Sequence, residues 1–431
     1  MKSIGLLKTA SVIAIAATSG AASLPALAQD GADGGVVDDT IIVTATRRAE
    51  GVQDIPLNIA AIGEAQIEEQ GFNELADTLA YVPGINVVDR GGRQGNPIIV
   101  RGLNAETLGP GDGNNDGGGT VATYLGEIPV FVDLKLNDMQ RVEVLLGPQG
   151  TLYGAGTLGG AIRYIPNRPD FEGDLFTVRS DIYQYSEADD LSTEFGFTFN
   201  KSLADNLAIR GSLDFQDDSG FIDYPLVVRE IGVSEPDPDF SDPAARAANL
   251  NPLTDVNTEE TLSGRLAVRW APTDRIDGTL TYYRQEADIG GRQVSGLRSG
   301  LPVGEYESAL RVPEPNEITN QLLALEVTAD LGFAELTSAS GFSKFEDEGQ
   351  RDQTDLLITL EFGYELFPTF TAFTREVGRE ERFNQELRLV STHDGPFNWI
   401  IGGFYNKFEL VGSSAEFTKG YSEFLGLTPG D

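Results

Sequence analysis

Residues 142–165, with the sequence VEVLLGPQGTLYGAGTLGGAIRYI, constrain the fold of this chain more than any other stretch. Six glycines, at positions 147, 150, 154, 156, 159 and 160, lie between two segments rich in β-forming residues. The backbone must therefore turn repeatedly where side chains would obstruct it. A linker would be rich in Ser, Pro or charge, whereas large apolar side chains separate these glycines and need a core to enter. The stretch is predicted to be a folded loop inside a domain.

The same glycines could suggest nucleotide binding, but the structural context that a nucleotide-binding motif requires is missing. Residues 154–159 satisfy the pattern G-x-G-x-x-G, but that fingerprint needs a strand before it and a helix after it. Here the strand-like segment 161–165 follows. No Lys-Ser or Lys-Thr pair follows the glycines, which also excludes a phosphate-binding P-loop. We therefore expect no nucleotide cofactor.

The composition argues against several kinds of chemistry. The 431 residues include no Cys and a single His, His393, and carry a net charge of -36. The absence of Cys removes disulfides, thiolate nucleophiles and Cys-type zinc sites, and one His disfavours a catalytic triad or a multi-His metal site. The acidity argues against a nucleic-acid partner, because phosphate binding needs a basic surface. We predict no catalytic residues, no metal site, no cofactor and no enzymatic activity.

Residues 1–28 have the features of a secretory signal peptide. Lys2 and Lys8 give a positive start, residues 6–17 are mostly apolar, and residues 26–28 form an A-x-A cleavage site. A membrane helix is the alternative, but the apolar run is short and no charged stop-transfer flank follows it. No later run approaches the length of a spanning helix. If the exported chain is embedded in a membrane, it must therefore use a β-barrel.

Residues 29–53 are predicted to be a periplasmic tail that carries a recognition peptide. Residues 29–39 are small, acidic and glycine-rich, with no pattern able to bury a core. The next residues are β-branched, which favours pairing with the exposed sheet edge of a partner protein. The alternative is that they form the first strand of the following domain. The candidate peptide consists of Thr40, Ile41, Ile42, Val43, Thr44 and Ala45.

Residues 54–168 are predicted to form a compact α+β domain. Residues 64–79 have a helical pattern, which Gly71 interrupts into two short pieces. A Pro-Gly turn at 83–84 ends that pattern. Strands are predicted at 54–62, 85–88, 97–101 and 121–132.

A glycine-rich loop at 109–119 imitates the opening of a calcium loop. Asp112, Asn114 and Asp116 have the required spacing, but the twelfth position is Thr123 where a bidentate Glu is needed. No helices flank the loop. A flexible loop without a metal is therefore the prediction, with specific calcium binding at 112–123 as the alternative.

From residue 169 onward, apolar and polar residues alternate with period two, which is the signal of transmembrane β-strands. In one such segment, Leu262 and Trp270 point one way while Ser263 and Arg265 point the other. This suits a strand with lipid on one face and a wet or plugged lumen on the other. The pattern predicts nine strands, at 176–185, 193–203, 207–215, 261–270, 276–283, 322–329, 334–345, 383–390 and 399–408.

Short and long connections alternate between these strands. Short turns fall at 204–205, 272–274, 331–332 and 393–396, and long connections at 218–259, 287–319 and 346–381. An outer-membrane barrel has short periplasmic turns and long external loops, whereas a soluble β-sandwich has no such asymmetry. The connections therefore favour a barrel.

The glycine stretch, the turn at 83–85, the IVRG strand at 99–102 and a strand containing Tyr124 together resemble the plug domain of TonB-dependent outer-membrane receptors. Residues 40–45 resemble a TonB box. The resemblance implies an α+β plug domain at 54–168, followed by an antiparallel transmembrane β-barrel at 169–431. Barrels of this class need about 22 strands. About nine are present, so the chain is expected to be a fragment or an incomplete gene product.

The resemblance also implies contacts between plug and barrel. Residues 385–390, QELRLV, are similar to a barrel strand whose Glu faces plug arginines, so Glu386 is expected to pair with Arg101. Leu146 stands where the family usually has a second Arg, which puts tight locking of plug and barrel in doubt. Loops at the place of 109–119 approach the ligand in the family. The candidate ligand-facing residues are Asp112, Asn114, Asn115 and Asp116.

As a member of this family, the chain would import a scarce and bulky nutrient through the cell outer membrane. TonB, driven by an inner-membrane energising complex, would pull on residues 40–45 and rearrange the plug. A metal chelate, above all a ferric siderophore, is the expected ligand, with cobalamin or an oligosaccharide as alternatives. A passive porin or surface-binding barrel is the alternative function, and it would have no use for residues 40–45.

Overall fold

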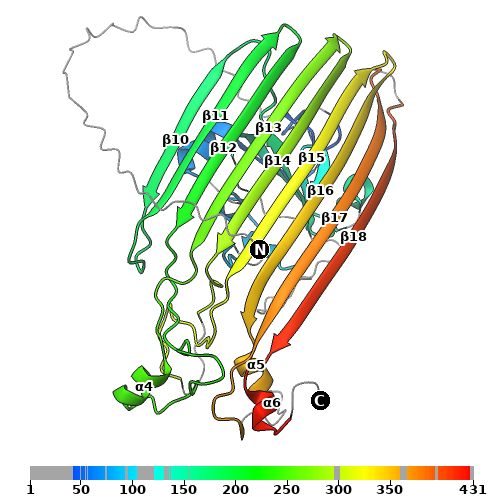
Figure 1. Ribbon diagram of the computed structural model, residues 1–431. Helices are drawn as coiled ribbons and strands as arrows, with labels where there is room; N and C mark the ends of the chain where they lie inside the picture. The colour runs from blue at the N-terminus through cyan, green and yellow to red at the C-terminus, as the bar shows by residue number, and fades with distance from the viewer. Residues whose placement is uncertain are drawn as a thin grey trace, which may run out of the picture. The chain divides into compact units, whose positions relative to one another are not determined.

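The computed structural model describes residues 42–427, except for 49, 54, 56, 73–74, 93–95, 104–120, 131–134, 136, 155, 296–300, 360–365 and 394–396. A five-stranded mixed sheet with short helices is followed by a nine-stranded antiparallel sheet (Figure 1). The predicted succession of an α+β domain and an antiparallel nine-stranded sheet is confirmed. Among the described residues, no helix is long and apolar enough to cross a membrane.

The five-stranded sheet has the order β3-β8-β9-β6-β7, in which only β6 and β9 run parallel. Its strands are β3 (Ile59–Gly63), β6 (Val121–Leu125), β7 (Ile128–Val130), β8 (Met139–Leu146) and β9 (Gly160–Pro166). Two further pairs complete the domain, β1 (Ile42–Val43) with β2 (Glu50–Gly51) and β4 (Ile85–Val87) with β5 (Ile98–Val100).

The single strand predicted over 121–132 is wrong, because this segment is a hairpin. β6 ends at Leu125 and β7 begins at Ile128, so Gly126 and Glu127 form the turn, with Gly126 at φ 59°. A left-handed backbone is easily adopted by glycine. The turn places the Glu127 carboxylate at the end of the hairpin, where it contacts three arginines described below.

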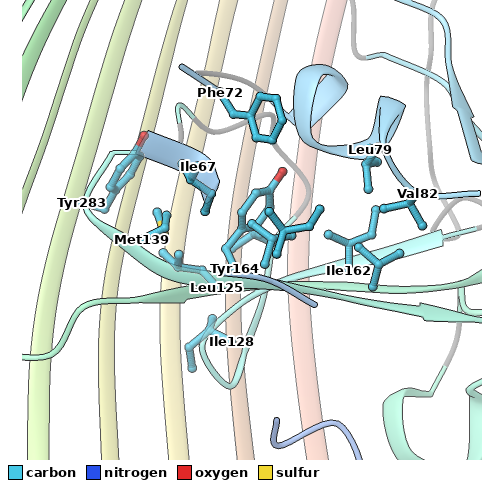
Figure 2. Packing of buried hydrophobic residues seen from close by; sticks show 14 of the residues in the cluster. Ile67, Phe72, Leu79, Val82, Leu125, Ile128, Met139, Ile162, Tyr164 and Tyr283 are labelled. Carbon is cyan, nitrogen blue, oxygen red and sulfur yellow. The ribbon is translucent and has the colours of Figure 1, made fainter. Parts of the chain in front are cut away.

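Two short helices cover one side of this sheet. They are α1 (Glu64–Gln70) and α2 (Leu75–Ala80), with Gly71 ending α1 in the left-handed conformation, as its position in the sequence predicts. Ile67, Phe72 and Leu79 are buried with strand residues such as Ile162. Figure 2 shows these side chains gathered around Tyr164. The core is thus formed by side chains that alternate along the strands and by one face of each helix.

The glycine-rich stretch forms a strand, a single helical turn and a second strand. β8 leads into α3 (Gly150–Tyr153), and β9 then pairs antiparallel with β8. The segment after the glycines is therefore a strand, as predicted. At Gly160 the two strands approach so closely that an added Cβ would lie 2.1 Å from the carbonyl oxygen of Leu145. Only glycine fits that contact without moving the backbone.

Gly160→Ala is expected to lower the free energy of unfolding of this domain by about 2–4 kcal/mol, because the backbone of β8 or β9 must shift. Gly150→Ala is the matched control in the same stretch, since its Cβ would meet only Thr157 Oγ1, at 3.9 Å. Hydrogen exchange of the β8 and β9 amides measures the difference. Equal protection in the two variants would contradict the expectation.

The nine-stranded sheet runs from β10 to β18 in sequence order, with every neighbour antiparallel. Its strands are β10 (Leu175–Tyr183), β11 (Ser192–Ala204), β12 (Leu207–Asp218), β13 (Glu259–Thr273), β14 (Ile276–Ile289), β15 (Asn316–Asp330), β16 (Ala334–Asp352), β17 (Phe373–Ser391) and β18 (Ile400–Phe417). The long connections and the C-terminal segment carry α4 (Pro243–Asn249), α5 (Thr354–Thr359) and α6 (Tyr421–Phe424).

All nine predicted strands are present, but several extend further toward the long connections than predicted. β17, for example, begins at Phe373 rather than at residue 383 and remains paired with β16 throughout. The added residues 375–382 are mostly charged or glycine, so the alternation that predicts a strand is absent there. Pairing between backbone groups continues beyond the apolar face, because it does not depend on the side chains.

The two faces of the sheet differ as the alternation predicts. Leu266 and Trp270 are about half exposed, whereas Ser263 and Arg265 are nearly buried beneath the five-stranded domain. Tyr283 of β14 faces the five-stranded domain. It is 4% exposed and packs in the core cluster of the five-stranded domain (Figure 2).

Candidate functional site: the box-proximal ionic cluster

The C-terminal part of the candidate recognition peptide is docked on the five-stranded domain. Thr40 and Ile41 lie outside the described residues, and Ile42 is half exposed, but Val43 and Ala45 are fully buried. β1 pairs with β2, which occupies one edge of the peptide. The predicted alternative, a first strand of the domain, therefore holds in part, because residues 42–43 do form a short strand.

Three side chains of the glycine-rich segment hold this peptide. The amide of Thr44 donates to Glu143 Oε1 at 3.1 Å, and Thr44 Oγ1 accepts from Arg163 Nη1 at 2.7 Å. The hydroxyl of Tyr153 donates to the carbonyl of Ala45 at 2.7 Å. The segment that constrains the fold is therefore also the surface on which the peptide is docked.

Arg163 and Glu143 form a fully buried ion pair beneath the peptide. They stand directly opposite each other on β9 and β8, and their Nη1 and Oε2 atoms are 2.7 Å apart. The second terminal nitrogen of Arg163 contacts Glu127 Oε1 at 2.8 Å. A buried charge is tolerated only when it is paired. Arg163 is the one charged residue of β9, and in β8 Glu143 stands within the apolar run 142–146, so a charge inside an apolar run is the sequence signal that could have identified the pair.

Arg47 connects the peptide to Glu127 and to the side chains around it. Its side chain is 2% exposed, its Nη1 forms an ion pair with Glu127, and its Nη2 donates to the carbonyl of Leu152 at 3.2 Å. Its guanidinium also lies 4.3 Å from the centroid of the Tyr153 ring. We call Arg47, Glu127, Glu143, Arg163, Glu386 and Arg388 the ionic cluster.

The ionic cluster extends to β17 of the nine-stranded sheet. Arg388 Nη2 contacts Glu127 Oε2 at 3.1 Å, and Arg388 also pairs with Glu386. Arg47 Nη2 lies 3.8 Å from Glu386 Oε2. Next to Arg47, Arg48 donates to the carbonyl and hydroxyl oxygens of Ser391, at 2.9 and 3.1 Å. One cluster thus joins the peptide, the five-stranded domain and the large sheet.

Electrostatics keep Glu127 ionised at the centre of this cluster. Burial by itself raises its pKa, but the charges of Arg163, Arg47 and Arg388 outweigh burial and lower the pKa from 4.5 to about 2. Because the folded-state pKa is depressed, the stabilisation is present above about pH 4.5 and is lost as the pH falls toward 2. That shift corresponds to about 3 kcal/mol.

The predicted pair of Arg101 and Glu386 is not formed. The Arg101 side chain is exposed, and its backbone amide donates to the carbonyl of Gly84 at 2.7 Å, while the ion pairs of Glu386 are with Arg47 and Arg388. Leu146, at the position of the family's second arginine, is buried in the apolar core. The positive charges on the plug side come from Arg163 and Arg47 instead.

A second group of ion pairs joins the five-stranded domain to the nine-stranded sheet, and it was not predicted from the sequence. The carboxylate of Asp138, just before β8, forms ion pairs with Arg210 of β12 and Arg265 of β13. Here the carboxylate belongs to the α+β domain and the arginines to the large sheet, the reverse of the expected arrangement. The alternation of polar and apolar residues along β13 places Arg265 on the inward face. This was the sequence signal that could have identified the contact.

The candidate loop residues Asp112, Asn114, Asn115 and Asp116 lie outside the described residues, so their proposed ligand contact stays a prediction. Among the residues that are described, no group of three or more His, Asp or Glu side chains could hold a metal ion.

Comparison with known proteins identifies the α+β domain. Residues 51–161 match the family model of the TonB-dependent Receptor Plug Domain. Residues 51–161 therefore form a TonB-dependent receptor plug domain. The five-stranded sheet with its helices is this plug, and the nine-stranded sheet corresponds to part of a receptor barrel.

The chain is similar to several known proteins over part of their length. It is 30% identical over 209 residues to the iron-regulated outer membrane virulence protein of Vibrio cholerae, covering 46% of this chain and 30% of that protein. It is 27% identical over 186 residues to the vitamin B12 transporter BtuB of Vibrio vulnificus, covering 43% of this chain and 29% of that protein.

The fold agrees with a solved receptor. The crystal structure of the ferric yersiniabactin uptake receptor FyuA from Yersinia pestis aligns with a TM-score of 0.63 and 17% identity, covering 84% of this chain and 50% of that one. The chain therefore spans about half the length of that receptor.

Proposed function

We propose that this receptor imports a bulky nutrient across the outer membrane and that TonB drives the transport by binding residues 40–45. The observation that carries the proposal is the docking of residues 43–45 on the ionic cluster that joins plug and barrel. The half-exposed Ile42 marks where the peptide emerges from the plug. A partner that pairs with the emerging peptide can pull directly on Thr44 and Arg47.

Withdrawal of the peptide would weaken the plug at a defined place. It would remove Arg47 from Glu127 and Glu386, and Thr44 from Glu143 and Arg163. Glu127 would retain Arg163 and Arg388, so the cluster would loosen rather than separate completely. Arg388 and Ser391 belong to the barrel sheet, and this part of the chain would stay in place as the peptide moves. The role is transport, without a chemical reaction.

For the ligand we propose a ferric siderophore. Its support is the similarity to an iron-regulated outer membrane protein and the shared fold with a ferric yersiniabactin receptor. A corrinoid such as vitamin B12 is the second candidate, because a vitamin B12 transporter is also among the relatives. An oligosaccharide remains a third.

Deletion of residues 40–45 from the full-length receptor tests energised import. The deletion is expected to abolish uptake of a radiolabelled ferric chelate while leaving its binding to the cell surface unchanged. Deletion of residues 32–37 is the matched control, because it shortens the tail by the same length and retains the candidate peptide. Uptake that survives the first deletion rejects energised import and favours a passive barrel. Uptake of cobalamin but not of any ferric chelate rejects the siderophore alone.

A further inference from the structure

Apart from the ionic cluster at β17, the plug contacts the wall of the barrel sheet in two different ways. On strands β14–β16 the contact is mainly apolar: Tyr283, Leu322, Ala324 and Ala339 belong to the same buried cluster as the plug core, and the Glu326 carboxylate accepts from the amide of Glu127 at 3.1 Å. Packing there is tight, since a Cβ added at Gly341 of β16 would lie 2.6 Å from the Ile128 side chain. We call this contact the seat.

Along β10–β13 the plug is separated from the wall by a cavity of about 440 Å³. The plug side of the cavity consists of residues of α1, Gly71, Phe72, Lys135 and residues 137–139, and the wall side includes Thr177, Arg179 and Thr198. Lining residues on β10 run from Leu175 to Asp181, so the cavity follows this strand for roughly 20 Å at the rise of a β-strand. Among the described lining residues are six carboxylates and three cationic side chains, which favour water inside it.

The contacts that cross this side are polar. Asn137 Nδ2 donates to Ser263 Oγ at 3.0 Å, and Asp138 pairs with Arg210 and Arg265. When such groups separate together, both partners regain water, so a hydrogen bond costs only about 0.5–1.5 kcal/mol net. A buried ion pair likewise contributes little when both charges are re-solvated together. Separation at the seat instead exposes apolar surface to water. This costs about 25 cal/mol of free energy per Å², and no new hydrogen bonds to water offset that cost.

We propose that the plug opens on its β10–β13 side and remains attached at the seat, so that the transported ligand passes between α1 and the wall formed by β10–β13. This inference rests on the proposed transport function and adds the route to it. The cavity is the start of the passage, and breaking the polar contacts of Asn137 and Asp138 widens it. The apolar contact of β14–β16 holds the plug inside the barrel during each cycle.

Reversible cross-links between introduced cysteines test the route, and the chain offers a background without native Cys. One receptor variant carries Asn137→Cys and Ser263→Cys across the cavity side. The matched variant carries Ile128→Cys and Gly341→Cys across the seat, where the smaller side chain introduced at position 128 leaves room for a Cβ at position 341. A short, reducible bis-thiosulfonate reagent joins each pair in the outer membrane of intact cells. Uptake of a ferric chelate or of cobalamin, whichever the wild type transports, is then measured before and after reduction.

The 137–263 cross-link is expected to lower uptake by about tenfold or more, because the plug would have to open on this side before every transport event. Reduction of the cross-link is expected to restore uptake. The 128–341 cross-link is expected to leave uptake within about twofold of the same variant after reduction. Full uptake with the 137–263 cross-link, or loss of uptake only with the 128–341 cross-link, overturns the proposed route. Absence of energised uptake by the wild-type receptor would instead reject the proposed function itself.

If cross-linking disturbs the fold, a second measurement remains. Single variants Ser263→Cys and Gly341→Cys are labelled with a membrane-impermeant maleimide in energised and de-energised cells supplied with ligand. In energised cells the thiol of the Ser263→Cys variant should be labelled several times faster, and that of the Gly341→Cys variant at an unchanged rate. The reverse ranking places the opening at the seat and contradicts the proposal.

Discussion

Arg163→Met is expected to destabilise the plug by about 3 kcal/mol, because it removes the fully buried cation that Glu127 and Glu143 share and leaves Glu143 with Arg141 as its remaining ion-pair partner. The Glu143 side chain is fully buried and that of Glu127 is 15% exposed, so water can replace little of the lost interaction. Methionine has a similar length, which limits the cavity that the substitution creates. Hydrogen exchange of β8 and β9 in the detergent-solubilised receptor measures the loss of protection.

Arg168→Met is the control for this substitution. Arg168 also pairs with a carboxylate of the barrel sheet, Asp277, but its side chain is 47% exposed. An exposed pair contributes about 0–1 kcal/mol. The double variant Glu143→Met/Arg163→Met should recover part of the stability that Arg163→Met loses, because it also removes the fully buried carboxylate that has lost one of its two cations. Equal effects of Arg163→Met and Arg168→Met would show that burial does not determine the strength of the pair.

The parts of the fold that could be predicted are those fixed by local patterns. Alternation along residues such as Leu262 and Ser263 identifies the barrel strands, because one face packs on the plug and the other does not. Gly71 and the glycines around α3 identify places where the backbone must turn. The hairpin at Gly126 was missed, since LGEIPV reads as a continuous strand when Glu127 has no visible partner.

The candidate site could be predicted only in part, because its contacts join residues far apart in the sequence. Glu127 and Arg388 are 261 positions apart, and no local pattern relates them. The resemblance placed Glu386 correctly in a plug-facing strand, yet its partners are Arg47 and Arg388 rather than Arg101. Which cation approaches a given carboxylate depends on how the plug packs against the wall, so the pairing follows from the tertiary structure alone.

Arg47→Ala is expected to release the candidate recognition peptide from the plug in the absence of ligand. The substitution removes a 2%-exposed guanidinium that contacts Glu127, the Leu152 carbonyl and the Tyr153 ring. Loss of one partner from a buried ionic cluster costs about 3 kcal/mol, which shifts the docking equilibrium roughly a hundredfold. A nitroxide attached to an Ile42→Cys background reports the change as a mobile component in its spectrum.

Arg48→Ala is the matched control for this release. Arg48 is the next residue, but it donates to two neutral oxygens of Ser391 instead of a buried carboxylate. Hydrogen bonds of that kind contribute about 1 kcal/mol, so the spectrum should change only slightly. If the nitroxide in the Arg47→Ala receptor stays as immobile as in the parent, the peptide is held by Glu143, Tyr153 and Arg163 without help from Arg47. The peptide would then be connected to the barrel sheet through Arg163, Glu127 and Arg388, and through Arg48 and Ser391.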